Sequence, residues 1–325
     1  MFEYTKEDLN IIANEMNFTR DTLEKVIRLV KILDFINSDS DLAGKLFLKG
    51  GTAINLFIFE LPRLSVDIDL DFNGNCSRDE MIIQREIITS KLNNYFEMED
   101  YNLNPKSKSR HSLDSFVVNY MNTGGMNDNI KIEINYSLRS HLFEPDYKNI
   151  AIKGIESKNK IAILNKFELF AAKLNALLSR AMPRDLYDVN NLVSYKIFSK
   201  DEMELLRNVF VFYTVLSQEV IPNEYSLEPL DYITLKTALA ALLPVLHKGT
   251  HIDLNSYKKN IEPFLSDLIN LNKEQKEFLN LFNQKIYKPE LLFTDQNILS
   301  RIINHPMIMW KISNKSDIPV KNSTI

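Results

Sequence analysis

Hydrophobic and polar residues alternate with different periods in the two halves of the chain. In the first half, short apolar runs of period two indicate strands, and runs with helical spacing indicate helices. We expect two helices in residues 1–45, a strand–turn–helix–strand unit in 46–72, a helix at 78–96, and strands at 116–120 and 130–137. The pair Gly124-Gly125 lies between the last two strands and is typical of a hairpin turn.

From about residue 160 the pattern is helical almost throughout. Phe167, Phe170 and Leu174 begin one apolar stripe. Later helices are predicted at 235–246, 254–271, 273–286 and 296–304, and the polar last dozen residues are expected to be loose. We therefore predict a first domain at residues 1–155 and a helical domain at 156–325 that closes over a cleft.

The composition is that of an ordinary globular protein, with 45% hydrophobic and 25% charged residues among 325. No apolar run is long enough to cross a bilayer, so we expect no membrane partner. The N-terminus is acidic and polar, unlike a signal peptide. The single cysteine, Cys76, excludes an internal disulfide and suits a reducing cytosol, which predicts a cytoplasmic protein.

The formal net charge of −4 gives no bulk electrostatic attraction for nucleic acid. Any such contact therefore needs a local basic patch. Two candidate patches, which could equally be solvated loops, are Lys106, Lys108, Arg110 and His111, and Lys153, Lys158, Lys160 and Lys166.

The segment Lys49-Gly50-Gly51-Thr52 holds two of only 8 glycines and joins an apolar run to a helix-like run. Glycine permits positive φ and close approach of the backbone to a ligand. The N–H groups that open the following helix attract phosphate, and Thr52 can cap that helix or touch a phosphate oxygen. Alone, the pair is explained as well by a plain strand-to-helix turn.

Three aspartates, Asp67, Asp69 and Asp71, alternate with apolar residues shortly after this turn. In a strand they share one face, where like charges repel. A pair of Mg²⁺ ions offsets that repulsion, because Mg²⁺ prefers carboxylates together with substrate phosphates. The alternative is an exposed edge strand with a solvated acidic face.

A third carboxylate is expected on a neighbouring strand, where Glu133 is flanked by isoleucines. If Glu133 shares the face of Lys131 and Asn135, it joins Asp67 and Asp69 as a metal ligand. Otherwise it is a surface glutamate paired with a lysine.

The second charged segment runs from Glu168 to Asp188. Lys166, Lys173 and Arg180 are seven residues apart, so we expect them on one helix face, opposite the apolar stripe. Such a cationic face could hold a triphosphate or simply be solvated. Arg184 and Asp188 are spaced as an ordinary i,i+4 ion pair.

Together these segments resemble the AbiEii/AbiGii nucleotidyltransferase toxins of the DNA polymerase β-like superfamily. Members have patterns of the form KGGTAL, RxSxDIDL, KIE and ELFAxKLxALxxRxxPRDLYDL. The matching stretches here are 49–53, 63–70, 131–133 and 168–188. The resemblance implies an α+β fold: a polymerase β-like core, with a small mixed sheet and flanking helices, followed by an α-helical domain.

The resemblance also implies roles for individual residues. Asp67, Asp69, Lys173 and Asp188 would be catalytic, with two Mg²⁺ ions, or Mn²⁺ in their place, held by Asp67 and Asp69 and in some members by a residue such as Glu133. The nucleotide-binding residues would be Lys49, Gly50, Gly51, Thr52, Arg63, Ser65, Arg180 and Arg184. Ser65 lies where some relatives are modified by their antitoxin, and Asp71 extends the acidic row beyond the minimal pair.

The implied activity is transfer of a nucleotide from a nucleoside triphosphate (NTP) to an RNA acceptor, expected to be a tRNA 3′ end. Its implied consequence is growth arrest in a toxin–antitoxin or abortive phage infection system, with a cognate antitoxin as partner. Two alternatives stay open: a nucleotidyltransferase with a small-molecule acceptor, and a non-catalytic nucleotide-binding interaction protein.

Overall fold

The computed structural model describes residues 2–152, 154–222 and 224–313. Its centre is an eight-stranded mixed sheet in the order β3-β5-β6-β2-β1-β10-β7, with β4 also paired to β5. The strands are β1 (Leu46–Lys49), β2 (Asp67–Asn73), β3 (Asn102–Leu103), β4 (Lys108–Arg110), β5 (Leu113–Met121), β6 (Asn127–Arg139), β7 (Asp146–Lys148) and β10 (Ile161–Ile163). A separate two-stranded sheet joins β8 (Ala151–Ile152) to β9 (Ile155–Glu156).

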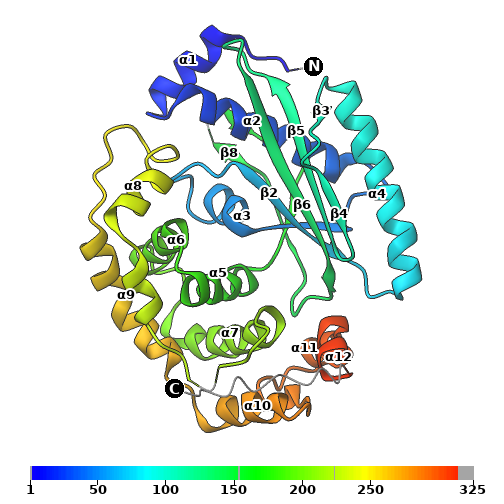
Figure 1. Ribbon diagram of the computed structural model, residues 1–325, viewed down its shortest axis with the longest axis vertical. Coiled ribbons are helices and arrows are strands. Elements are labelled where there is room, and N and C mark those ends of the chain that lie inside the picture. The colour runs from blue at the N-terminus through cyan, green and yellow to red at the C-terminus, as the bar shows by residue number, and fades with distance from the viewer. Residues whose placement is uncertain (1, 153, 223, 314–325) are drawn as a thin grey trace, which may run out of the picture.

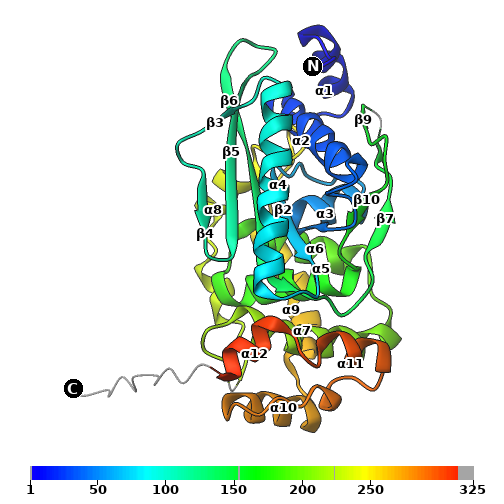
Figure 2. The ribbon, with the colours of Figure 1, turned by 90° about the vertical axis from the view of Figure 1, so that its right-hand side faces the viewer.

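Helices pack on the apolar face of this sheet. In β6, buried Ile130, Ile132 and Ile134 alternate with more exposed polar residues, as period-two patterning requires. The helices α2 (Arg20–Ser38) and α4 (Arg78–Met98) run along this side of the sheet (Figure 2), and α1 (Lys6–Glu15) packs against α2. The polar face is left for the elements that form the site.

The second half of the chain is helical and stacks beside α3 (Gly50–Phe57), away from α4 (Figure 1). In it, α5 (Lys166–Arg180) packs against α7 (Met203–Ser217), α6 (Pro183–Ser194) and α3. The outer helices are α8 (Leu235–Leu242), α9 (Leu254–Ile269), α10 (Lys273–Asn283), α11 (Gln296–Ile302) and α12 (Pro306–Ser313), with short 3-10 turns at Lys200–Glu202, Glu228–Tyr232 and Pro289–Leu291. One main hydrophobic core runs through both halves.

The α+β architecture expected from the sequence is confirmed, and the expected helices and the 116–137 hairpin are present. The sheet nevertheless includes β10, which pairs parallel with β1 through Leu48 and Ile163 and follows the expected boundary at residues 155–156. Three buried apolar residues are too few for periodicity to identify a strand. Residues 314–325, expected to be loose, lie outside the described residues.

Candidate active site

The turn between β1 and α3 carries the two adjacent glycines. Gly50 has a φ of +71°, which glycine adopts without strain. A Cβ atom on Gly50 would lie 2.5 Å from Oδ2 of Asp69, and one on Gly51 would lie 2.8 Å from Nη2 of Arg63. Side chains are therefore excluded here by the close approach of the turn to Asp69 and Arg63.

Thr52 plays a different part from the one expected. The N-cap residue of α3 is Lys49, so the expectation that Thr52 caps the helix is wrong. Thr52 is fully buried, and its hydroxyl lies 2.5 Å from the main-chain oxygen of Asp67, to which it donates, and 3.0 Å from Oγ of Ser65. Thr52 thus joins the glycine turn to the start of β2.

A cavity of about 400 Å³, here called the first cavity, opens beside the glycine turn. Its lining includes Gly50, Gly51, Arg63, Ser65, Asp67 and Asp69 from the first half of the chain, and Lys173, Arg180 and Arg184 from α5 and α6. The expected convergence of the two aspartates with the paired glycines is therefore present. Ser65 is largely buried at this wall.

Asp67 and Asp69 lie two residues apart on one face of β2. Within the described residues, neither carboxylate has a hydrogen-bond or ion-pair partner of its own. Burial raises the pKa of Asp69, the ammonium of Lys49 opposes that rise, and the carboxylates of Asp67 and Glu133 add to it. Two unneutralised carboxylates at a cavity wall fit Mg²⁺, which binds one or two protein carboxylates and completes its shell with phosphate and water.

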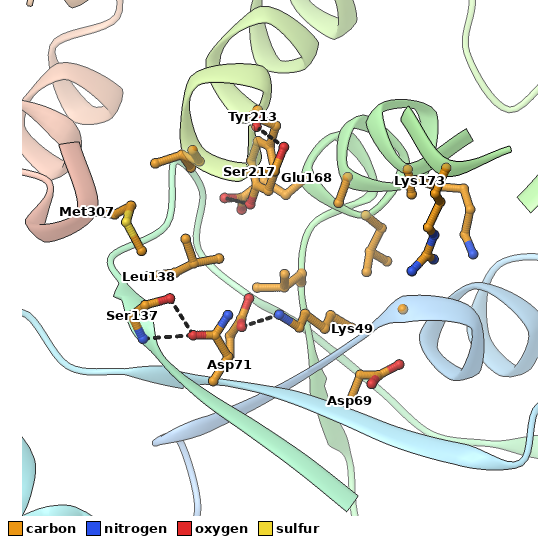
Figure 3. A pocket seen from close by; sticks show the side chains of 18 residues that line it. Lys49, Asp69, Asp71, Ser137, Leu138, Glu168, Lys173, Tyr213, Ser217 and Met307 are labelled. Atoms are coloured by element: carbon orange, nitrogen blue, oxygen red, sulfur yellow. Dashed lines mark hydrogen bonds and ion pairs between the residues drawn. The ribbon is translucent and has the colours of Figure 1, made fainter. Parts of the chain in front are cut away.

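Asp71 occupies the same face but a different environment. It is fully buried, and its Oδ1 lies 2.5 Å from Nζ of Lys49 (Figure 3). Its Oδ2 is buried without a hydrogen-bond partner in the described structure. Lys49 and Asp71 both line another cavity of about 460 Å³, here called the second cavity. It shares Gly50, Asp69, Lys173 and Arg180 with the first cavity.

Glu133 lies beside Asp69, because β2 and β6 are parallel and pair Asp69 with Glu133. It shares the face of Lys131 and Asn135, which the sequence had left undecided. Its carboxylate, however, is 2.9 Å from Nζ of Lys131, and the described residues contain no group of three potential metal ligands. In this arrangement Glu133 is a charge beside Asp69 that is paired with Lys131.

A buried ionic cluster ties the helical half to the turn. Asp188 is fully buried and accepts two hydrogen bonds from Arg63, at 2.8 and 2.7 Å. Nζ of Lys173 lies 3.0 Å from Asp188 and 2.8 Å from Asp185. Burial alone would raise the pKa of Asp188, but Arg63 and Lys173 outweigh it and hold the pKa at about 2. Asp188 is therefore an ionised anchor for two cations.

The expected cationic face of α5 is divided between three environments. Lys173 is buried in the cluster, Lys166 pairs with Glu202 at 2.6 Å, and only Arg180 has a largely exposed side chain. Their seven-residue spacing still puts all three on one helix face, but α5 is packed on several sides, so that face is not uniformly solvated. Arg184 does not pair with Asp188; its Nε donates to the carbonyl of Ala241.

Sequence reasoning missed the residues that close the second cavity from the helical half. Glu168 accepts hydrogen bonds from the Leu142 amide and the Tyr213 hydroxyl, both at 2.9 Å. Tyr213 and Ser217 come from α7 and Met307 from α12 (Figure 3). Their separation in the chain left no local motif to find. Asn55 was also missed, although its amide bridges the Gly51 carbonyl and Asp188.

This combination of a glycine turn opening a helix, two unpaired aspartates and facing cations around one cavity is that of a nucleotidyltransferase. The chain belongs to the family described as Nucleotidyl transferase AbiEii toxin, Type IV TA system, which it matches over residues 31–283. It is thus a nucleotidyltransferase toxin of a type IV toxin–antitoxin system, a class that acts on NTPs and has a cognate antitoxin.

Among solved structures, the chain is similar to MenT4, the nucleotidyltransferase toxin Rv2826c from Mycobacterium tuberculosis H37Rv. The TM-score is 0.63 and the identity 15%, covering 92% of this chain and 99% of that one, which shows a shared fold. No curated protein sequence matches the chain. Among the residues that the structure describes, no helix has both the length and the hydropathy to span a membrane.

Proposed function

We propose that this enzyme transfers a nucleotide from an NTP to the 3′-terminal hydroxyl of an RNA acceptor, with tRNA as the expected acceptor, and that the reaction requires Mg²⁺ or Mn²⁺. The observation that carries this proposal is the pair Asp67 and Asp69, unneutralised and lining one cavity with the N-terminus of α3. A helix N-terminus attracts phosphate, and paired carboxylates attract the metal ions that accompany it.

The residues around the first cavity have different roles in the proposed reaction. Gly50 and Gly51 let the triphosphate approach the backbone of α3, and Arg180 and Arg184 offset its negative charge. Asp67 and Asp69 would hold two metal ions, which supply charge stabilisation at the attacking and leaving oxygens of an in-line displacement at the α-phosphate. The acceptor oxygen forms the new bond to phosphorus, and pyrophosphate departs.

Lys173 and Asp188 act together in this proposal. Lys173 lines both cavities, which places it beside the triphosphate, and its ammonium is held there by Asp185 and Asp188. Asp188 has no exposed surface and is engaged by Arg63 and Lys173. We therefore assign Lys173 to substrate binding and Asp188 to positioning Lys173 and Arg63.

The test is transfer of label from each α-labelled NTP to purified tRNA and total RNA, with and without Mg²⁺. The wild-type protein should label RNA, and Asp67→Asn and Asp69→Asn should abolish labelling while retaining the thermal unfolding midpoint. Asp201→Asn, which removes an exposed carboxylate from the 3-10 turn before α7, is the matched control and should keep full activity.

A folded Asp69→Asn variant that still labels RNA would overturn the metal-binding role. Labelling of a small molecule such as an aminoglycoside, with none of RNA, would replace the RNA acceptor by the alternative. Expression in growing cells should cause growth arrest with the wild-type protein and not with Asp67→Asn.

A further inference from the structure

A third cavity of about 500 Å³ lies at the outer edge of the molecule, beyond the residues of the proposed reaction. It is bounded by the start of α4, the turn between β4 and β5, the end of β6, and α12. The part of its lining that matters here, called the Trp310 surface, is Arg78, His111, Arg139, Met307 and Trp310. Figure 2 shows α12 below the ends of α4 and β4.

Trp310 is the chain's single tryptophan, and its side chain is 60% exposed. A large aromatic ring held by a helix and left in water forfeits the free energy that its burial would contribute. Met307, one helical turn earlier, is only partly exposed and lies at the boundary with the second cavity. An exposed ring at the mouth of a path to the active site is a stacking platform for a planar group.

Positive charge surrounds this ring. Nη2 of Arg78 lies 3.3 Å from Nε2 of His111, and Nη1 of Arg139 donates to the Cys76 carbonyl while its Nε has no hydrogen-bond partner in the described structure. The adjoining β4 hairpin carries further exposed basic residues, Lys106, Lys108 and Arg110. The first turn of α4 also carries two acidic residues, Asp79 and Glu80, of which Glu80 is engaged in the capping box with Ser77.

The basic hairpin is one of the two patches that the sequence offered for nucleic acid. In the other patch, Lys166 is paired with Glu202 and Lys153 lies outside the described residues. In a chain with a net charge of −4, the Trp310 surface therefore combines local positive charge with an aromatic ring. Single-stranded nucleic acid is bound by this combination, because phosphates meet cations while bases stack on the ring.

The Trp310 surface adjoins the site. The third cavity shares Ser137 and Met307 with the second cavity, which shares Asp69 and Lys173 with the first. Adjoining cavities therefore lie in a row from Trp310 to Asp67 and Asp69. A double helix is too wide for a cavity of about 460 Å³, whereas a single strand with splayed bases can enter one.

We infer that the single-stranded 3′ segment of the acceptor RNA enters along this path, with one base stacked on Trp310 and backbone phosphates at Arg78 and Arg139. This inference rests on the proposed transfer to RNA and specifies where that RNA binds. It distinguishes the acceptor end from the triphosphate end of the site, which lies at the first cavity.

Because Trp310 is the only tryptophan, its fluorescence reports on this surface alone. The full-length protein would be titrated with a short single-stranded oligoribonucleotide blocked by a 3′-phosphate, so that no transfer occurs. We expect saturable quenching by this oligonucleotide and much weaker quenching by a blunt RNA duplex of the same sequence. Absence of quenching by a single strand that binds, as judged by its own fluorescence anisotropy, would overturn the inference.

Substitutions distinguish the contribution of base stacking on Trp310 from that of phosphate contacts to the arginines. Trp310→Ala should weaken binding of the blocked oligonucleotide about tenfold, while Trp310→Phe should retain most of the affinity. Arg78→Ala should lower the slope of log affinity against log salt by about 0.7, the value for one phosphate contact of a single strand. Lys6→Ala, which removes an exposed charge from α1, is the matched control and should leave both quantities unchanged.

Two outcomes distinguish this inference from the proposed function. If RNA is labelled and the KM for RNA is unchanged in Trp310→Ala, the entry path is wrong and the transfer stands. If the blocked strand quenches Trp310 but no RNA is ever labelled, the surface stands and the proposed reaction fails. Where RNA is labelled, the KM for the NTP should not respond to Trp310→Ala, since the triphosphate lies at the other end of the path.

Discussion

Arg63 and Asp188 are 125 residues apart in the chain and form a two-point ion pair with N–O distances of 2.8 and 2.7 Å. Only 2% of Arg63 and none of Asp188 is exposed. The pair joins the segment that precedes β2 to α6, so it sets the position of the helical half relative to the glycine turn. The Asp188 carboxylate also pairs with Lys173 and so positions Lys173 at both cavities.

We predict that Asp188→Asn destabilises the protein by about 3–5 kcal/mol, because two buried cations lose their counter-charge. Urea unfolding measures this change. A double-mutant cycle with Arg63→Met should show strong coupling, with the double variant less destabilised than the sum of the single variants. If Asp188→Asn lost activity at unchanged stability, a direct catalytic role would replace the positioning role.

Gly50 and Gly125 both have a positive φ and offer a matched comparison. Gly50→Ala and Gly125→Ala impose the same backbone strain of about 1 kcal/mol, since φ is +71° and +79°. Nothing lies within 4 Å of a Cβ at Gly125, whereas a Cβ at Gly50 would displace the carboxylate of Asp69. Gly50→Ala should therefore abolish nucleotide transfer, and Gly125→Ala should preserve it at a similar loss of stability.

Transfer assays and urea unfolding on the two variants check this comparison. Equal activity in both would mean that the displacement of Asp69 does not matter to the reaction.

Glu168 should make the stability of the fold depend on pH. Its burial raises its pKa to about 7 from an ordinary 4.5, although hydrogen bonds from Leu142 and Tyr213 oppose the rise. The folded state therefore holds a proton that the unfolded state releases, and the free energy of unfolding falls as pH rises from 4.5 to 7. His141 lies 3.9 Å away, but burial lowers its pKa, so it does not supply a compensating charge near neutrality.

We predict that Glu168→Gln removes the fall in the free energy of unfolding with rising pH. The amide oxygen of the glutamine still accepts the hydrogen bonds, and the side chain carries no charge at any pH. The variant should gain up to about 3 kcal/mol relative to wild type between pH 4 and pH 8. Urea unfolding across this range is the measurement. A pH-independent difference between the two proteins would show that folding does not change the pKa of Glu168.

Lys173 and Arg180 line the same two cavities but differ in burial. Lys173→Ala should weaken NTP binding about tenfold and also lower stability, because Asp185 and Asp188 lose a buried cation. Arg180→Ala should weaken NTP binding with less than about 1 kcal/mol change in stability, since 63% of its side chain is exposed. Calorimetric titration with a non-hydrolysable NTP and urea unfolding test both variants.

Unchanged NTP affinity in Lys173→Ala would remove Lys173 from the binding role. Unchanged affinity in Arg180→Ala alone would confine the role to Lys173.

Local patterning alone determined the glycine turn, the acidic strand and most helices. The strand of Asp67 and Asp69 alternates over enough residues for its polar face to be identified, and a glycine pair before a helix predicts a close approach whatever packs around it. These features depend on neighbours in the chain, which the sequence displays directly.

Only the tertiary structure decided what each charged side chain faces. Spacing placed Lys173 on a cationic face that could bind a triphosphate or be solvated, and it spaced Asp188 for a pair with Arg184. Packing instead buried Lys173 and joined Asp188 to Arg63. The tertiary structure likewise decided that Asp71 pairs with Lys49 and that Glu168 accepts a hydrogen bond from Tyr213 of α7. Charge pairing depends on distance in space, and segments more than a hundred residues apart meet only when the sheet and helices close around one core.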